Sequence, residues 1–374
     1  MPAPILLVTP LDPSRTDSGG VQRTHLWLES LRTLGEVDVL HLAPDAGTHV
    51  RGNYFALPVG PSRLPWKRYA PDAGLTRRVE ALMARPLASY RLIVGRYALP
   101  LSMLALPAGV PTVVDLDDHC YRHGRPWTEE PGSLPQRLRK ALGHWLERRA
   151  VAAHDHAFVA NVADVPLVAA RACSLLPNVA LDWANAEAPA PPPRAEPTLL
   201  FVGALWYQPN RDGVEWFLGK VWPAVRRAVP QARLTLAGAA SPRQRRAWER
   251  QPGVSAPGFV PDLREAYANA SAVVVPIHAG GGSNIKVLEA LAHARPCIVS
   301  TFAAAGFGAA LRDGAHLLKA DNARAFADRT VAVLRKPPAY AAMAAAGAAQ
   351  VRRHFSPAAF TARVSRTLAP LLRP

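Results

Sequence analysis

The sequence has little cysteine and no long apolar run. Its three cysteines, Cys120, Cys173 and Cys297, lie far apart and form neither a CxxC motif nor a cluster with histidine. This spacing argues against a disulfide framework and a structural zinc site, and it fits a reducing compartment. No window approaches the roughly 20 consecutive apolar residues that a membrane-spanning helix needs. The first ten residues also lack the basic start of a signal peptide. We therefore expect a cytoplasmic protein, soluble or peripheral to a membrane.

Acidic residues and lysine are both scarce beside arginine. The 374 residues include 44 lysines and arginines against 28 acidic residues, a formal net charge of +16, and only six of the basic residues are lysine. Such usage is typical of a GC-rich genome. The alternative is attraction to polyanions such as nucleotide phosphates, an anionic membrane or nucleic acid. Nucleic acid is the weakest candidate, because the sequence holds no helix-turn-helix, zinc-finger or RNP-like motif.

The apolar content and the length favour two α/β domains. Hydrophobic residues make up 49% of the chain and charged residues 19%, so it can bury substantial cores. Short apolar runs bounded by turn residues alternate with amphipathic stretches, the pattern of parallel sheets covered by helices. The predicted strands are 5–9, 37–42, 92–95, 112–116, 157–160, 198–203, 233–237, 272–276 and 296–300. The predicted helices are 21–34, 134–153, 212–228, 263–270, 285–294 and 357–372.

A proline- and alanine-rich segment interrupts this alternation in the middle of the chain. Residues 185–197 cannot form a core and are typical of a stiff interdomain linker. We predict Rossmann-like domains at 1–184 and 198–356, and a crossover helix at 357–374 that packs back toward the N-terminal domain. Parallel sheets facing across a cleft would bind ligands at the carboxyl ends of their strands.

The most informative segment is a strand, a run of three glycines and a helix within residues 273–301. Ser283 and Asn284 are good N-caps, so the helix is expected to start there. A glycine turn that leads into a helix exposes unpaired amides to an anion. Lys286 adds a positive charge in the first turn, and Glu289 lies one turn onward on the same face. This order predicts a nucleoside diphosphate with its ribose, whereas a surface Lys–Glu pair beside a flexible loop is the alternative.

A second candidate site is the acidic cluster that follows the strand at 112–116. Asp115, Asp117, Asp118 and His119 would lie at the carboxyl end of that strand. Carboxylates there would bind sugar or acceptor hydroxyls, or polarise an acceptor nucleophile. Alternatively, the two later aspartates cap the next segment and the histidine is a loop residue. The cluster would also suit Mg²⁺ or Mn²⁺, but we expect no metal.

Taken together, these motifs resemble a known family, the retaining nucleotide-sugar glycosyltransferases of sequence family 4, which have the GT-B fold. The resemblance covers nearly the whole chain, and the turn at residues 280–283 is similar to the GGG(S/T) turn of some bacterial branches. Its most specific parts are residues 280–290 and 294–300. Supporting parts are residues 18–20, 176–178, 201–203, 209–210, 216–217 and 258–263.

The resemblance implies a role for each matched position. Lys286 would bind the donor diphosphate, and Glu289 would accept a hydrogen bond from the ribose. The glycine turn and helix start would give backbone amides to the phosphates, through Gly281, Gly282, Ser283, Asn284 and Ile285. The base would lie along Gly258, Phe259 and Val260. Gly19 and Gly20 would form the first glycine loop, and Gly203 would end the first strand of the C-terminal domain.

Three departures from the family pattern stand out. The first glutamate of its Glu-x7-Glu motif falls on Gly281. The basic residues usual after the strand at 198–203 are missing, with Arg211 or His278 as candidate substitutes. The usual N-domain histidine falls on Asp117, which makes Asp117, Asp118 and His119 candidate catalytic residues beside Lys286.

We therefore predict a GT-B glycosyltransferase that needs no cofactor beyond its UDP- or GDP-linked sugar donor. Its acceptor would be a saccharide, a lipid-linked sugar or a small molecule, as in polysaccharide biosynthesis. One alternative is a GT-B sugar-nucleotide epimerase or hydrolase. Another is a catalytically decayed protein that binds polyanions or the inner face of the cell membrane through its basic helix at 134–153. A nicotinamide dehydrogenase is the least favoured alternative, because residues 18–20 do not complete G-x-G-x-x-G.

Overall fold

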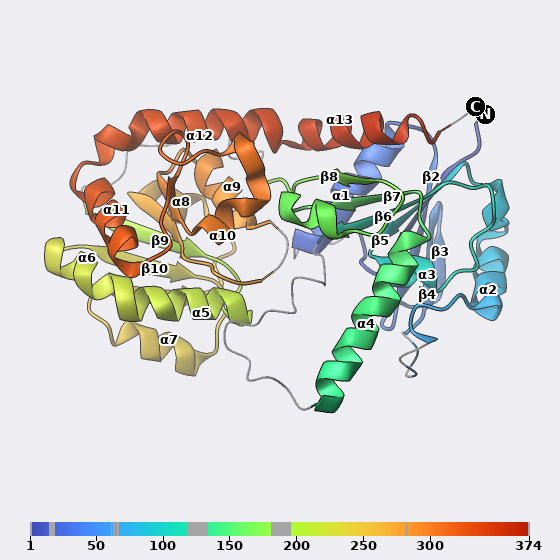
Figure 1. Ribbon diagram of the computed structural model, residues 1–374, viewed down its shortest axis with the longest axis horizontal. Coiled ribbons are helices and arrows are strands. Elements are labelled where there is room, and N and C mark those ends of the chain that lie inside the picture. The colour runs from blue at the N-terminus through green and yellow to red at the C-terminus, as the bar shows by residue number, and fades with distance from the viewer. Residues whose placement is uncertain are drawn as a thin grey trace. The chain divides into compact units, whose positions relative to one another are not determined.

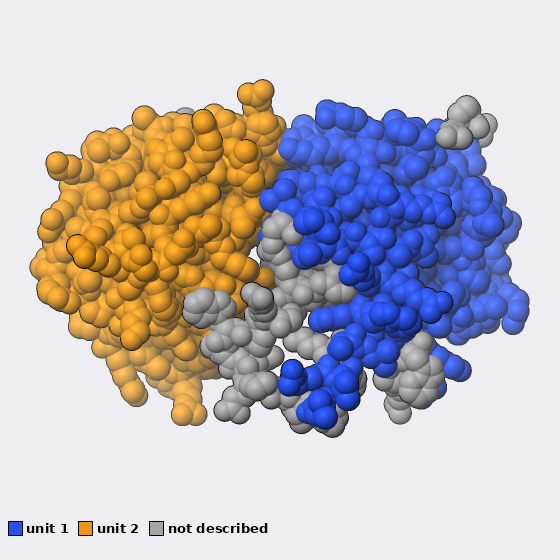
Figure 2. All heavy atoms as spheres, viewed as in Figure 1, with its two compact units in different colours: residues 1–178, 357–374 blue, residues 179–356 orange. Residues whose placement is uncertain are grey.

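The chain forms two compact units, residues 1–178 with 357–374 and residues 179–356 (Figure 2). The computed structural model describes residues 2–14, 19–60, 62, 64, 67–117, 134–180, 196–280 and 283–372, with the backbone alone at 135, 136, 139, 140 and 163. The predicted linker therefore lies almost wholly outside the described residues. Each unit is a sheet of mainly parallel strands covered by helices (Figure 1).

The first unit is built on an eight-stranded sheet in the order β3-β4-β2-β1-β5-β6-β7-β8. Its central strands are buried along their whole length, because helices cover both faces of a parallel sheet. Only the edge strand β3 runs antiparallel, pairing with β4. The strands are β1 (Ile5–Thr9), β2 (Val37–Ala43), β3 (His49–Arg51), β4 (Tyr54–Pro58), β5 (Leu92–Arg96), β6 (Thr112–Asp117), β7 (His156–Val159) and β8 (Cys173–Leu175).

The last helix of the chain completes this first unit. Helix α13 packs against α1, where Phe360 meets the ring of Trp27 edge-on at 6.1 Å. Ser30 and Thr361 join the two helices by a 2.9 Å hydrogen bond between their hydroxyls. The predicted return of the C-terminal helix is confirmed. The helices of this unit are α1 (Gly19–Arg32), α2 (Ala73–Met83), α3 (Ala98–Ser102), α4 (Leu134–Ala152) and α13 (Pro357–Leu368).

The second unit is built on a six-stranded parallel sheet in the order β11-β10-β9-β12-β13-β14. Its strands carry the largest hydrophobic core of the chain. The strands are β9 (Thr198–Val202), β10 (Arg233–Ala237), β11 (Val254–Gly258), β12 (Ala272–Val275), β13 (Cys297–Val299) and β14 (Leu318–Lys319). The helices are α5 (Gln208–Trp216), α6 (Trp222–Ala228), α7 (Pro242–Glu249), α8 (Arg264–Asn269), α9 (Ile285–Ala292), α10 (Thr301–Ala304), α11 (Ala323–Arg335) and α12 (Ala341–His354).

The helix predicted at 212–228 is longer and less regular than expected. It starts at Gln208 and passes from α5 to α6 through a π-helical turn, Phe217–Val221. Pro223 follows that turn and cannot donate a backbone hydrogen bond, which accounts for the local widening of the helix. The other predicted helices and strands are present within a few residues of their expected bounds.

Candidate functional site

The carboxyl edge of the second sheet brings three strand ends close together. Gly203 follows β9 and donates to the carbonyl of Ala237 at 3.0 Å, and Gly238 donates to the carbonyl of Gly258 at 2.8 Å. A Cβ at Gly238 would lie 1.8 Å from the carbonyl oxygen of Gly203, so only glycine fits there. The strand order reverses between β9 and its neighbour β12, and open α/β sheets bind ligands at such a point.

Lys286 lies at this reversal, in the first turn of α9. Its Nζ donates to the Oδ1 of Asn210 at 3.0 Å and, more weakly, to the Oδ1 of Asn284 at 3.5 Å. Its Cε would lie 3.0 Å from a Cβ at Gly203, so the glycine makes room for the lysine stem. Burial lowers the pKa of Lys286 to about 8, against the opposing attraction of Glu289. Both lysine contacts are to neutral amides, which leaves its charge available to an anion.

The start of α9 differs from the predicted cap. Asn284 occupies the N-cap position, but its side chain caps no backbone amide of the helix. It contacts the Nζ of Lys286 and the carbonyl of Ala303 instead. The hydroxyl of Ser283 is buried and has no hydrogen-bond partner among the described residues. The amides at the helix start, including that of Ile285, are therefore not occupied by a side-chain cap, as an anion site requires.

Glu289 is buried one turn beyond Lys286. Its Oε2 accepts a 3.1 Å hydrogen bond from the hydroxyl of Tyr267, which comes from α8. The Tyr267 ring stacks on His293 at 4.5 Å with an interplanar angle of 11°. Glu289 is thus oriented by a neighbour from another helix, and the surface Lys–Glu pair is not what the structure contains.

The remaining predicted donor residues lie around the same edge. Phe259 is 73% exposed beside Gly258, whose φ of 91° is in the left-handed region. Arg211 directly follows Asn210 on α5, and its charge acts on Glu215 one turn further along. The His278 ring packs edge-on against Trp216 at 4.7 Å. Val260 follows in the same loop and is half-buried. Gly281 and Gly282 lie outside the described residues.

The acidic cluster of the first unit divides into two different carboxylates. Asp115 is fully buried and accepts 2.7 and 2.8 Å hydrogen bonds from the guanidinium of Arg23. It also accepts from Arg96 and, at 2.7 Å, from the Nε1 of Trp27. These arginines hold the pKa of Asp115 below its usual value even though burial acts in the opposite direction. Asp115 is saturated, and its role is structural.

Asp117 ends the same strand with a φ of 50° and meets its partners at longer distances. The Nε of Arg23 lies 3.7 Å from its Oδ1. Asp117 accepts hydrogen bonds of 3.2 Å from Asn178 and 3.3 Å from Arg96. Arg96 also donates to the carbonyl of Gly20 at 3.4 Å, so the start of α1 lies beside the acidic strand end. Gly19 begins that helix. The candidates Asp118 and His119 lie outside the described residues, so their predicted roles are untested.

Two structural findings concern ions and membranes. Within the described part of the chain, no three histidine, cysteine, aspartate or glutamate side chains are grouped so that they could hold a metal ion. No described helix is both long enough and apolar enough to cross a bilayer.

Several residues of this geometry were missed by sequence reasoning. Asn210 was noted only as part of a Pro-Asn pair, not as the partner of Lys286. Tyr267 and Arg96 carry no motif, and only the fold places them against Glu289 and Asp117. The partner of a buried polar side chain depends on which residues the fold brings beside it. A single sequence therefore gives little indication of such a pair.

Comparisons with known proteins give a family for part of the chain and a fold for all of it. Residues 196–336 match the family model for glycosyl transferases group 1. No curated protein sequence matches the chain. Among solved structures, sucrose-phosphate synthase from Thermosynechococcus elongatus has a TM-score of 0.71 at 19% identity, with 99% of both chains covered. WaaG, a glycosyltransferase involved in lipopolysaccharide biosynthesis, has a TM-score of 0.66 at 15% identity, covering 97% of this chain and 99% of WaaG.

A further similar structure was solved with ligands. Anabaena HepE, in complex with UDP and glucose, has a TM-score of 0.63 at 12% identity, covering 97% of this chain and 99% of HepE. These likenesses assign the GT-B fold to the whole chain, and the family model assigns a group 1 domain to residues 196–336.

Proposed function

We propose that the chain is a glycosyltransferase that uses a UDP- or GDP-linked sugar donor and retains the anomeric configuration. The group 1 match at residues 196–336 supports the transferase class. The observation that carries the donor class is Lys286, held by neutral Asn210 at an uncapped helix start. A diphosphate would accept hydrogen bonds from the uncapped amides at the start of α9 and would also pair with the charge of Lys286. Glu289, oriented by Tyr267, would accept hydrogen bonds from the ribose hydroxyls.

Catalysis would come from orientation and from charge stabilisation on the departing diphosphate. Lys286 and the amides at the start of α9 would stabilise that charge. The donor phosphate itself would take the proton of the acceptor hydroxyl, so no separate base is required. We place the acceptor, a saccharide, a lipid-linked sugar or a small molecule, near Asp117 at the carboxyl edge of the first sheet.

We also propose that transfer proceeds without a bound metal ion. Asp115, which is more buried than Asp117, already accepts hydrogen bonds from Arg23, Arg96 and Trp27 on both oxygens. Metal coordination would require breaking these ion pairs. The positive charge that a metal would supply to the diphosphate is supplied by Lys286 instead.

The test of the donor class is a thermal-shift panel with UDP, GDP, ADP, dTDP and CMP. A nucleotide at about 100 times its dissociation constant should add roughly 2.7 kcal/mol to the free energy of unfolding. Lys286→Ala should abolish that shift and reduce transfer about 30- to 1000-fold, while exposed Lys220→Ala on the same unit changes neither.

The alternatives give different results in the same assay. A protein that binds UDP or GDP and transfers sugar to no acceptor, but releases the sugar from the donor, would be a hydrolase. One that instead inverts a carbon of the donor sugar would be an epimerase. Binding of no nucleotide at all would favour a decayed protein.

A contact with an anionic membrane is the second part of this proposal, with the protein on the cytoplasmic side. Helix α4 exposes an apolar stripe at helical spacing, and its acidic residue Glu147 is buried. The stripe residues are Leu134 (67% exposed), Leu138 (62%), Leu142 (37%) and Trp145 (56%). The exposed basic residues beside them are Arg137, Arg148 and Arg149.

Vesicle flotation tests this contact. The chain should float with phosphatidylglycerol vesicles and remain free with phosphatidylcholine vesicles, because the flanking residues are cationic. Leu138→Ser with Trp145→Ser should release it. Equal recovery of wild type and double variant would remove α4 from the membrane contact.

A further inference from the structure

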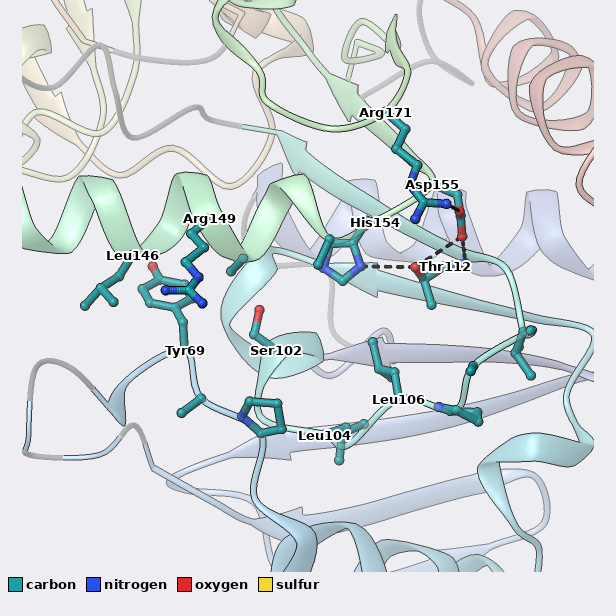
Figure 3. A pocket seen from close by; sticks show the side chains of 18 residues that line it. Tyr69, Ser102, Leu104, Leu106, Thr112, Leu146, Arg149, His154, Asp155 and Arg171 are labelled. Carbon is teal, nitrogen blue, oxygen red and sulfur yellow. Dashed lines mark hydrogen bonds and ion pairs between the residues drawn. The ribbon is translucent and has the colours of Figure 1, made fainter.

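The first unit contains a cavity at the edge of its sheet opposite the acidic strand end. It has a volume of about 740 Å³ and lies where β6 and β8 begin, beneath α4 (Figure 3). Thr112 lines it at the start of β6, whereas Asp117 ends that strand about 17 Å away. Small-molecule sites usually have volumes of 300–1,000 Å³. The cavity is therefore separate from the transfer site and large enough for a ligand.

Most of the cavity wall is apolar, with a single buried polar group left unsatisfied. Leu104, Leu106 and Leu146 line it, as Figure 3 shows. His154 is 2% exposed, and its Nδ1 lies 3.2 Å from the hydroxyl of Thr112. Its Nε2 has no hydrogen-bond partner among the described residues. Burial lowers the pKa of His154 to about 4, so the ring is neutral near pH 7. Such a buried group usually has a partner, which a ligand oxygen would supply.

Among the described residues, one charge of the cavity lining has no ion-pair partner. Arg171 is paired with Asp155 at 2.9 Å, at one end of the cavity in Figure 3. Arg149 lies toward the other end and has no carboxylate partner in the described part of the chain. Its guanidinium is 5.6 Å from the Trp145 ring, which belongs to the exposed stripe of α4. The Arg149 end of the cavity thus combines an apolar interior with a cation that forms no ion pair with a described residue.

We infer that this cavity binds an alkyl chain that ends in a phosphate or phosphate ester. The chain would lie along the leucines, the anion would bind Arg149, and the Nε2–H of His154 would donate to a ligand oxygen. A free alkyl phosphate and a phospholipid share this chemistry. The inference goes beyond sugar transfer and does not depend on the donor site.

Calorimetric titration of the full chain with dodecyl phosphate, kept below its micellar concentration, tests the inference. Wild type should bind it. Ala150→Phe, which fills the cavity from α4, should weaken binding at least tenfold, whereas Ala152→Phe on the exposed side of the helix should not. Arg149→Gln should weaken binding about fivefold, the upper range for an exposed ion pair, and leave dodecanol binding unchanged. Arg148→Gln, outside the cavity, is the matched charge control.

Two further measurements make each outcome decisive. Ala153→Phe fills the same cavity from beyond the helix end and replaces Ala150→Phe if that variant melts early. A second arm measures flotation with phosphatidylglycerol vesicles. If the filled variants lose dodecyl phosphate binding but still float with vesicles, the ligand of the cavity is a free amphiphile. If they also lose flotation, the ligand is a membrane lipid. The inference would be overturned if Ala150→Phe and Ala153→Phe bind dodecyl phosphate and float with vesicles as well as Ala152→Phe does. The UDP-induced thermal shift, recorded on the same variants, reports the donor site separately.

Discussion

Lys286 and Asn210 meet through a 3.0 Å hydrogen bond that joins the first turn of α9 to the first turn of α5. Asn210 is itself fixed, because its Nδ2 donates to the carbonyl of Ala204 at 2.9 Å. The lysine is thereby held in place by an amide dipole. No described carboxylate forms an ion pair with it, although Glu289 attracts its charge from one turn away. An aspartate at position 210 would hold it equally well but would cancel the charge needed for a diphosphate.

The first prediction follows from this pair. Asn210→Ala should lower turnover about tenfold, because a hydrogen bond to a charged group contributes roughly 1.5–3 kcal/mol. Asn210→Asp should keep the lysine position but weaken UDP affinity, since an ion pair competes with the diphosphate. Gln208→Ala, on the exposed side of the same turn, is the control. Unchanged kinetics in both Asn210 variants would separate this residue from the donor site.

The second prediction concerns pH. The pKa of Lys286 is lowered to about 8, so the free protein loses this charge as pH rises through that value. A bound diphosphate favours the charged form and raises the pKa. UDP affinity should therefore be constant below pH 8 and fall about tenfold per pH unit above it. Titrations at pH 7 and pH 9 check this, and Lys286→Gln should make the two affinities equal. A wild-type affinity that does not fall by pH 9 would contradict the assignment.

The third prediction concerns Glu289. Glu289→Gln should weaken UDP binding about tenfold, because the ribose hydroxyls lose an ionised acceptor. Tyr267→Phe removes only the hydroxyl that orients this carboxylate, so its effect should be smaller and in the same direction. Comparison of UDP with 2′,3′-dideoxy-UDP isolates the ribose contact. The affinity difference between UDP and the dideoxy analogue should be smaller in Glu289→Gln than in wild type. An equal difference in both proteins would show that Glu289 does not contact the ribose.

The fourth prediction is that transfer survives exhaustive chelation. Lys286 and the start of α9 provide the charge stabilisation that a divalent ion would otherwise supply. Turnover in EDTA should stay within about twofold of the untreated protein, a range too small to reflect loss of a catalytic ion. Loss of activity that Mg²⁺ or Mn²⁺ restores would instead favour metal binding at the acidic cluster.

Most of the strands were readable from the sequence because their signals are local. Buried parallel strands are continuous apolar runs, and β1 and β10 match the predicted bounds. Weaker elements were not predicted: β4 ends in an exposed proline, and α12 is rich in alanine with no clear apolar face. Asn284 is the N-cap residue, as predicted, but its side chain contacts Lys286 and the carbonyl of Ala303 instead of capping the helix amides. Asp115 and Asp117 read alike in sequence, and only their spatial neighbours separate them.

The last prediction uses that separation. Asp115 balances two buried arginines, so Asp115→Asn should lower the free energy of unfolding by about 3–5 kcal/mol. Asp117 has weaker and longer contacts, and its φ of 50° is one that asparagine adopts readily. Asp117→Asn should therefore keep the melting temperature and UDP affinity close to wild type.

Measured beside folding and nucleotide binding, turnover should distinguish Asp117→Asn from Asp115→Asn. If Asp117 contacts the sugar or the acceptor, its asparagine variant should lose turnover while still binding the nucleotide, because Lys286 and Glu289 belong to the other unit. Melting temperature, UDP affinity and turnover must be measured on the same preparation. Parallel losses in all three would make Asp117 a structural partner of Arg96, like Asp115. A selective loss of turnover would place Asp117 on the acceptor side of the reaction, because removing a contact made only during transfer leaves nucleotide binding and folding intact. The control, exposed Asp72→Asn on the same unit, should show no such loss.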